Sequence, residues 1–160
     1  MCYFVHIAVP QEHGGQVRAW PSDDLLVSDC RSEGVISQFP RSWSAFTVTD
    51  PSGHCSCDLY AASCKRFDEQ RERARYRVKG WSEAKISRAV AARRPKETRY
   101  DRFVRRVGEV TLACNEVQLC ATDGHKDVQV TFPRMSMDRL AYLAADGTFP
   151  TETVVCIQCR

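Results

Sequence analysis

The beginning of the chain carries apolar residues in the pattern of a buried β-strand. In the first ten residues, MCYFVHIAVP, apolar side chains occupy both alternating sets of positions. A strand that is apolar on both faces belongs in the interior of a sheet, so His6 is expected to be a core histidine. Residues 45–49 predict a second strand, because Phe46 and Val48 alternate with small or hydroxyl-bearing residues.

The middle of the chain changes to helical spacing. A first helix is expected from about residue 61 to 78. Ser82 is a good N-cap for a second helix that runs to about residue 94, and Trp81 can pack on Ile86 as a hydrophobic staple. A third helix, over about residues 98–107, carries an apolar face that consists of Tyr100, Phe103, Val104 and Val107.

Past Gly108 the spacing returns to a period of two. Residues 110–114, 117–121 and 128–132 each alternate apolar with other positions, and residues 153–157 predict a final strand. Short strands that follow one another with turn residues between them favour an antiparallel meander.

These elements predict an α+β fold, an antiparallel sheet with a central block of two or three basic helices packed on one face. The length and the 43% hydrophobic content suit a single domain, residues 1–160, with a basic helical segment at about 61–107. No apolar run approaches the ~18 residues of a membrane helix, so no membrane partner is expected. Without a signal-peptide pattern at its start, the chain is expected to be cytoplasmic.

Charge is segregated along the sequence. The net charge is +3, yet residues 65–106 contain sixteen Lys or Arg and six Asp or Glu. Such a segment indicates a basic surface for an acidic partner, with nucleic acid as the first candidate and an acidic protein surface as the second. Ion pairs within a solvated helical face are the structural alternative.

The first two basic helices, joined at a glycine, have the outline of a helix-turn-helix unit over residues 76–94. In that arrangement the second helix would enter the major groove of DNA, and the first would contact phosphates. The residues expected to contact nucleic acid are Arg71, Arg75, Lys79, Arg88, Arg93 and Arg94.

Nine cysteines are many for a chain of 160 residues. Because nine is odd, a complete disulfide framework is not expected, and the cysteines are interpreted as thiols or metal ligands of a reducing compartment. A buried free cysteine behaves as a small hydrophobe, so only clustered cysteines suggest chemistry.

Two cysteine pairs are closely spaced. Cys55 and Cys57 follow a turn over residues 50–53, and Cys156 and Cys159 end the chain. Zinc takes four soft or borderline ligands in a tetrahedron, which two such pairs can supply. The sequence therefore predicts a structural zinc site formed by these four residues, while Cys2 and Cys30 are expected to take no part in it.

The leading interpretation is a non-enzymatic binding protein with this cysteine cluster and a basic helical surface. The alternative is a small cysteine-dependent enzyme or thiol redox protein that uses His54, Cys55 and Cys57, since a thiol at the start of a helix is favoured as thiolate. No glycine-rich phosphate loop and no H-E-x-x-H motif occurs, which disfavours nucleotide hydrolysis and metalloprotease activity.

Overall fold

The chain forms two compact units. The computed structural model describes residues 2–23, 25–60, 69–93, 97, 99–123, 134–137, 140 and 153–158. One unit comprises Met1–Ser63 together with Arg99–Arg160, and the other comprises Cys64–Thr98. That the two units behave as a single domain stays a prediction.

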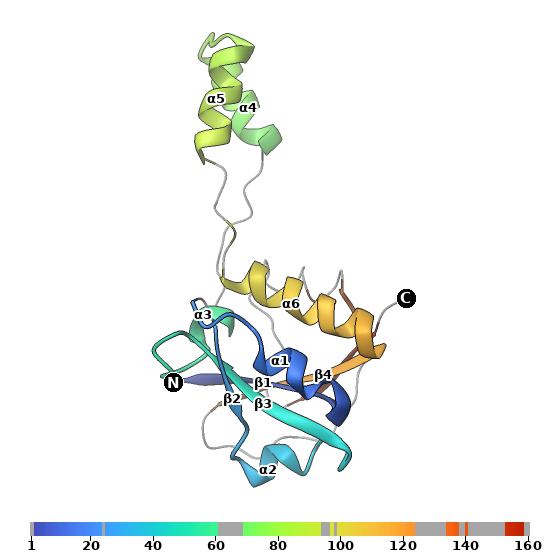
Figure 1. Cartoon of the computed structure of the whole chain (residues 1–160). Helices are drawn as coiled ribbons and strands as arrows, with labels where there is room; N and C mark the ends of the chain where they lie inside the picture. The colour runs from blue at the N-terminus through green and yellow to red at the C-terminus, as the bar shows by residue number, and fades with distance from the viewer. Residues whose placement is uncertain are drawn as a thin grey trace. The chain divides into compact units, whose positions relative to one another are not determined.

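A six-stranded sheet is the frame of the first unit (Figure 1). Its strand order is β2-β3-β1-β4-β6-β5. Neighbouring strands are antiparallel except β5 and β6, which are parallel. The strands are β1 (Tyr3–Pro10), β2 (Leu26–Asp29), β3 (Trp43–Thr49), β4 (Glu116–Asp123), β5 (Arg134–Ser136) and β6 (Val154–Gln158). The predicted α+β class with an antiparallel sheet is confirmed, and β1 is an interior strand as its two apolar faces predict.

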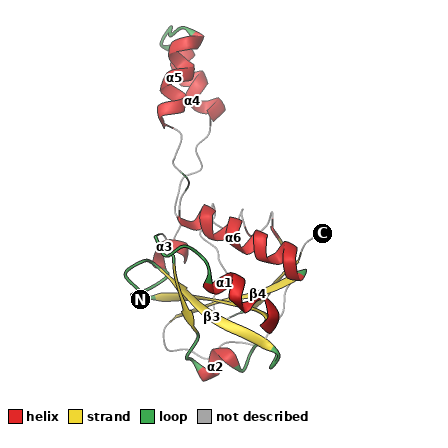
Figure 2. Ribbon diagram, viewed as in Figure 1, coloured by secondary structure: helices red, strands yellow, loops and turns green. Residues whose placement is uncertain are grey.

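Helices accompany the sheet in the first unit and form all the regular structure described in the second (Figure 2). The first unit contains the 3-10 helix η1 (Gln11–His13) and the helices α1 (Gly14–Arg18), α2 (Glu33–Ile36), α3 (Cys57–Tyr60) and α6 (Arg99–Cys114). The second contains α4 (Glu69–Val78) and α5 (Glu83–Arg93). These last two and α6 correspond to the three basic helices expected from the sequence, although residues 61–68 of the first lie outside the described part.

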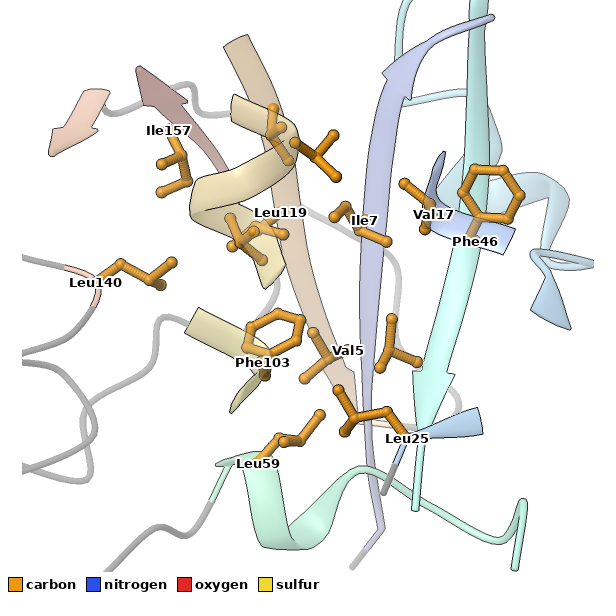
Figure 3. Packing of buried hydrophobic residues seen from close by; sticks show 14 of the residues in the cluster. Val5, Ile7, Val17, Leu25, Phe46, Leu59, Phe103, Leu119, Leu140 and Ile157 are labelled. Carbon is orange, nitrogen blue, oxygen red and sulfur yellow. The ribbon is translucent and has the colours of Figure 1, made fainter. Parts of the chain in front are cut away.

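The main core lies between one face of the sheet and α6 (Figure 3). Val5 and Ile7 of β1 point to this face, as do Phe46 of β3 and Leu119 of β4. Phe103 of α6 packs against them and is fully buried. Because side chains alternate along a strand, the even-numbered residues of β1 point to the opposite face.

The third basic helix is longer than the sequence pattern indicated. Val110 and Cys114 lie in α6, so the predicted strand over residues 110–114 is wrong. Tyr100, Phe103, Val107 and Val110 are spaced three, four and three residues apart and form one buried helical stripe. Leu112, which belonged to the apparent alternation, is 74% exposed.

The expected meander is replaced by a different pairing. Residues 117–121 lie in β4, which pairs with β1 on one side and with β6 on the other. The final strand was predicted correctly as β6. The expected strand over residues 128–132 lies outside the described residues.

His6 is a buried, hydrogen-bonded histidine on the second face of the sheet, which confirms its assignment to the core. Its Nδ1 lies 3.1 Å from Thr47 Oγ1 and its Nε2 lies 3.0 Å from Thr122 Oγ1. Cys30 Sγ lies 3.7 Å from Nδ1. Burial lowers the pKa of His6 to about 4, so the ring is neutral at physiological pH.

The second unit is a helical hairpin with a small core of its own. Gly80, at a φ of 70°, ends the turn after α4 in a backbone conformation that favours glycine. The Trp81 ring stacks on Tyr76 with ring centroids 4.7 Å apart, and it packs against the buried cluster that contains Ile86 and Val90. Trp81 and Ile86 thus belong to the same small core, and the direct staple between them stays a prediction.

Candidate metal centre and basic hairpin

Three thiols converge at one edge of the first unit. The sulfur atoms of Cys2, Cys55 and Cys57 all lie within 4.8 Å of one another. Cys2 is exposed, and the other two are half-buried. Among the described residues, this is the group of Cys, His, Asp and Glu side chains whose geometry suits a metal ion.

Ser56 fixes the two loop thiols beside the first strand. Its hydroxyl accepts the backbone N–H of Val5 at 2.8 Å and donates to the carbonyl of Val48. Val5 and Val48 face each other in the register of β1 and β3, so the hydroxyl bridges the two strands. The Ser56 N–H also donates to the Tyr3 carbonyl at 2.7 Å. Because Tyr3 follows Cys2, this attachment brings both neighbours of Ser56 to Cys2.

A tight turn returns the chain from β3 to this position. The Gly53 N–H donates to the Asp50 carbonyl at 2.9 Å, and Gly53 has a φ of 77°. The Asp50 N–H in turn donates to the Cys55 carbonyl at 2.9 Å, which closes the loop. The turn predicted over residues 50–53 is therefore present, and it delivers Cys55 and Cys57 to the end of the sheet where β1 begins.

The electrostatic surroundings of Cys55 favour its protonated thiol. A backbone hydrogen bond from Cys57 favours the Cys55 thiolate. The Cys57 side chain, burial and the charge of Asp50 act in the opposite direction, and together they raise the pKa of Cys55. A metal ion that binds here must displace protons from its ligands.

Cys156, a predicted ligand, lies elsewhere in the sheet. It faces Gln118 of β4, and Gln118 faces Ala8 of β1. Ala8 of β1 is six residues beyond Cys2, which directly precedes this strand, and six extended residues span about 20 Å at ~3.3 Å per residue. Burial and then the neighbouring Glu116 carboxylate raise the pKa of Cys156 to about 11. The structure thus brings Cys55 and Cys57 together with Cys2 and not with Cys156, while Cys159 lies outside the described residues.

Cys2 was not expected to be part of the site. More than fifty residues separate it from Cys55, so no short sequence motif connects them. The available signal was the pairing of β1 with β3, which places the residues after Thr49 beside the first residues of β1.

His54, the base of the alternative thiol-enzyme interpretation, is exposed. Its ring nitrogens are not part of the three-thiol group. A nucleophilic cysteine is activated by a lowered pKa, whereas the pKa of Cys55 is raised.

Ion pairs occupy part of the basic surface of the hairpin. Between residues 69 and 93 there are eight Lys or Arg and three Glu. Glu72 binds Arg93 at 2.8 Å and Arg75 at 3.6 Å. Glu83 binds Arg77 at 2.7 Å and Arg73 at 3.5 Å, and Arg73 also binds Glu69 at 3.0 Å.

The six residues expected to contact nucleic acid thus divide into groups. Arg75 and Arg93 are paired with Glu72. Lys79 and Arg88 make no ion pair with the described residues, and Arg71 has an interaction of its own. Arg94 lies outside the described residues.

The two helices of the hairpin run side by side in opposite directions (Figure 1). Arg77 and Glu83 connect them next to the turn, and Glu72 and Arg93 connect them near the other end. The helices of a helix-turn-helix unit cross at ~90–120° and therefore diverge from the turn. The hairpin is accordingly an antiparallel helix pair and differs from that motif.

Comparison of the chain with known proteins finds no matching family model, no matching curated protein and no matching solved structure. Within the described residues, no helix combines the length and apolarity required to cross a bilayer.

Proposed function

We propose that the protein is a non-enzymatic binding protein whose sheet is stabilised by a zinc ion held by Cys2, Cys55 and Cys57. The observation that supports this proposal is the convergence of three sulfur atoms within 4.8 Å. Tetrahedral zinc with ~2.3 Å bonds holds its sulfur ligands ~3.8 Å apart, so small side-chain rotations suffice for binding. Three thiolates supply three of the four tetrahedral positions.

Zinc at this position would stabilise the fold by joining two distant segments. Cys2 precedes β1, and Cys57 is the first residue of α3. Because the unfolded chain offers no preformed site, the free energy of metal binding adds to the free energy of folding. The metal is therefore structural in this proposal.

Elemental analysis of protein purified without added metal tests the proposal, together with titration of accessible thiols before and after chelation. We expect about one zinc ion per chain, and a chelator that exposes additional thiols. Cys55→Ser should lose the metal. Cys114→Ser is the matched control, because the Cys114 sulfur is half-buried and donates to the Val110 carbonyl, a contact that serine can keep. Metal-free protein with unchanged thiol reactivity would contradict the proposal.

We propose as a second function that the hairpin of α4 and α5 binds an acidic partner, nucleic acid first. The excess of eight Lys or Arg over three Glu within 25 residues supports it. Retention of the protein by immobilised DNA at low salt tests this function. Elution at the same salt as a protein without a basic segment would contradict it.

A further inference from the structure

We infer that the hairpin binds the phosphate backbone of double-stranded DNA, without reading base sequence, through Lys79, Lys85 and Arg88. This inference rests on the proposed nucleic-acid function of the hairpin. Three observations support it: some cations are held in ion pairs within the hairpin, the aromatic faces are covered, and one side of α5 is exposed.

Three arginines join the two helices of the hairpin through ion pairs with glutamates. Arg77 and Glu83, and Arg93 and Glu72, join the two helices at 2.7 and 2.8 Å. Arg73 bonds both to Glu69 of its own helix and to Glu83 of α5. Exposed ion pairs are individually weak, but together these pairs fix how the two helices align. A ligand phosphate that took these arginines would leave their glutamates beside its own negative charge.

Between residues 69 and 93, three cations remain available for a ligand. Lys79, Lys85 and Arg88 are exposed and make no ion pair with the described residues. Lys79 lies in the turn, and the other two lie on α5, three residues apart. Residues at i and i+3 lie on the same side of a helix, so these two cations occupy neighbouring positions.

The aromatic rings of the hairpin offer no open face to a nucleobase. Within residues 69–93 the aromatic residues are Tyr76 and Trp81. Tyr76 is buried, and Trp81 stacks on it with the ring planes 17° apart. Lys85 Nζ lies over the Trp81 ring, 4.1 Å from its centroid. Binding of single strands depends on bases that stack on aromatic side chains, so this surface does not suit a single strand.

The exposed side of α5 favours duplex DNA over duplex RNA. Ala84, Ala91 and Ala92 are exposed around Arg88 and carry no hydrogen-bonding side-chain groups. Small side chains let a helix approach closely, but they cannot read the donors and acceptors of base edges. The major groove of B-DNA is wide enough for a helix to lie against its phosphate walls, whereas that of A-form RNA is deep and narrow.

The test measures binding of a short DNA duplex of mixed sequence by fluorescence anisotropy over about 50–200 mM salt. Each phosphate contact contributes ~0.9 to the slope of log affinity against log salt. We expect the triple variant Lys79→Gln, Lys85→Gln, Arg88→Gln to reduce the magnitude of that slope by about 2.7. Lys79→Arg, Lys85→Arg, Arg88→Lys should retain the original slope, because the three charges remain.

A control with the same loss of charge is Arg18→Gln, Arg105→Gln, Arg106→Gln. These arginines belong to the first unit, and each is paired with Asp29 or Glu109. The control should bind as the original protein does. The inference is wrong if the slope of log affinity against log salt falls as much in this control as in the hairpin variant. It is also wrong if the slope of the hairpin variant does not fall at all.

The identity of the ligand is tested with the same protein. We expect the duplex to bind more tightly than its separated strands or a duplex RNA, and a second duplex of different sequence to bind equally. Tighter binding of single strands or RNA, or a tenfold preference for one sequence, overturns the inference while leaving nucleic-acid binding intact. No binding of any of these probes at the lowest salt overturns the second proposed function itself.

Discussion

The Ser56 hydroxyl accepts the backbone N–H of Val5 at 2.8 Å, between two cysteines that approach a third. One buried hydroxyl therefore both completes the hydrogen bonding of β1 and sets the position of the thiol group. Ser56 is fully buried, and its other bond goes to the carbonyl of Val48.

Replacing Ser56 by alanine should destabilise the protein by about 2 kcal/mol, because it leaves a buried N–H and a buried carbonyl without their partner. Urea unfolding measures the change. Ser28→Ala, at an exposed position of β2, is the control and should cost less than ~0.5 kcal/mol. Equal effects of the two substitutions would show that the bridge contributes nothing specific.

Cys2→Ser should remove the effect of a chelator on thermal stability. In the original protein, a strong zinc chelator is expected to lower the melting temperature, because metal binds the folded state alone. The variant should already melt at that lower temperature and respond no further. A melting temperature of Cys2→Ser that equals that of the original protein, with the same chelator response, contradicts a role for Cys2.

His6 should make stability depend on pH. Its pKa is 6.5 in the absence of burial and about 4 in the folded protein, so the unfolded chain binds the proton more tightly. The neutral ring of His6 therefore contributes roughly 3 kcal/mol to the free energy of unfolding. This contribution is complete above pH 6.5 and is lost as the pH falls from there to about 4.

Urea unfolding at a series of pH values measures this loss, with His6→Asn lacking it. His13→Asn, at a half-buried position, is the control and should keep the pH dependence of the original protein. Identical pH profiles for His6→Asn and the original protein would assign the acid sensitivity to other groups.

Trp81→Ala should lower the free energy of unfolding of the hairpin by about 2 kcal/mol, since it removes the ring that stacks on Tyr76 and packs against the small core of the hairpin. Amide hydrogen exchange of α4 and α5 should become faster by an order of magnitude or more. Val78→Ala, at a position that is 89% exposed, should leave exchange unchanged. Unaltered exchange in Trp81→Ala would mean that the stack does not hold the two helices.

The local spacing of apolar residues was sufficient to locate several of the helices and strands. It located β1, β3, α5 and β6 because the side chains of each are sorted by burial at the period of that element. It fails at Gly108, where the change of spacing predicts the end of a helix. Gly108 lies within α6, and a Cβ there would lie 3.2 Å from Met137 Cε. Gly108 thus lies close to a residue that is distant in sequence, a relationship that no local pattern reveals.

The candidate site was predicted in part for the same reason. Cys55 and Cys57 were identified by their spacing and by the turn before them, both of which are local features. Cys2 depends on the register of β1 against β3, and the separation of Cys156 depends on the order β1-β4-β6. Strand order is decided by packing across the whole sheet, so the spacing of the cysteines in the sequence could not identify the third ligand.

The position of β1 also has a consequence for synthesis of the chain. β1 pairs with β3 on one side and with β4 on the other, and β4 begins more than a hundred residues after β1 ends. At ~5–20 residues per second, a ribosome needs on the order of 5–20 s to make the intervening segment. During that interval one edge of an apolar strand has no partner. We therefore expect a chaperone that binds extended apolar segments to associate with chains stalled before residue 116, and to release chains in which β4 is free to pair with β1.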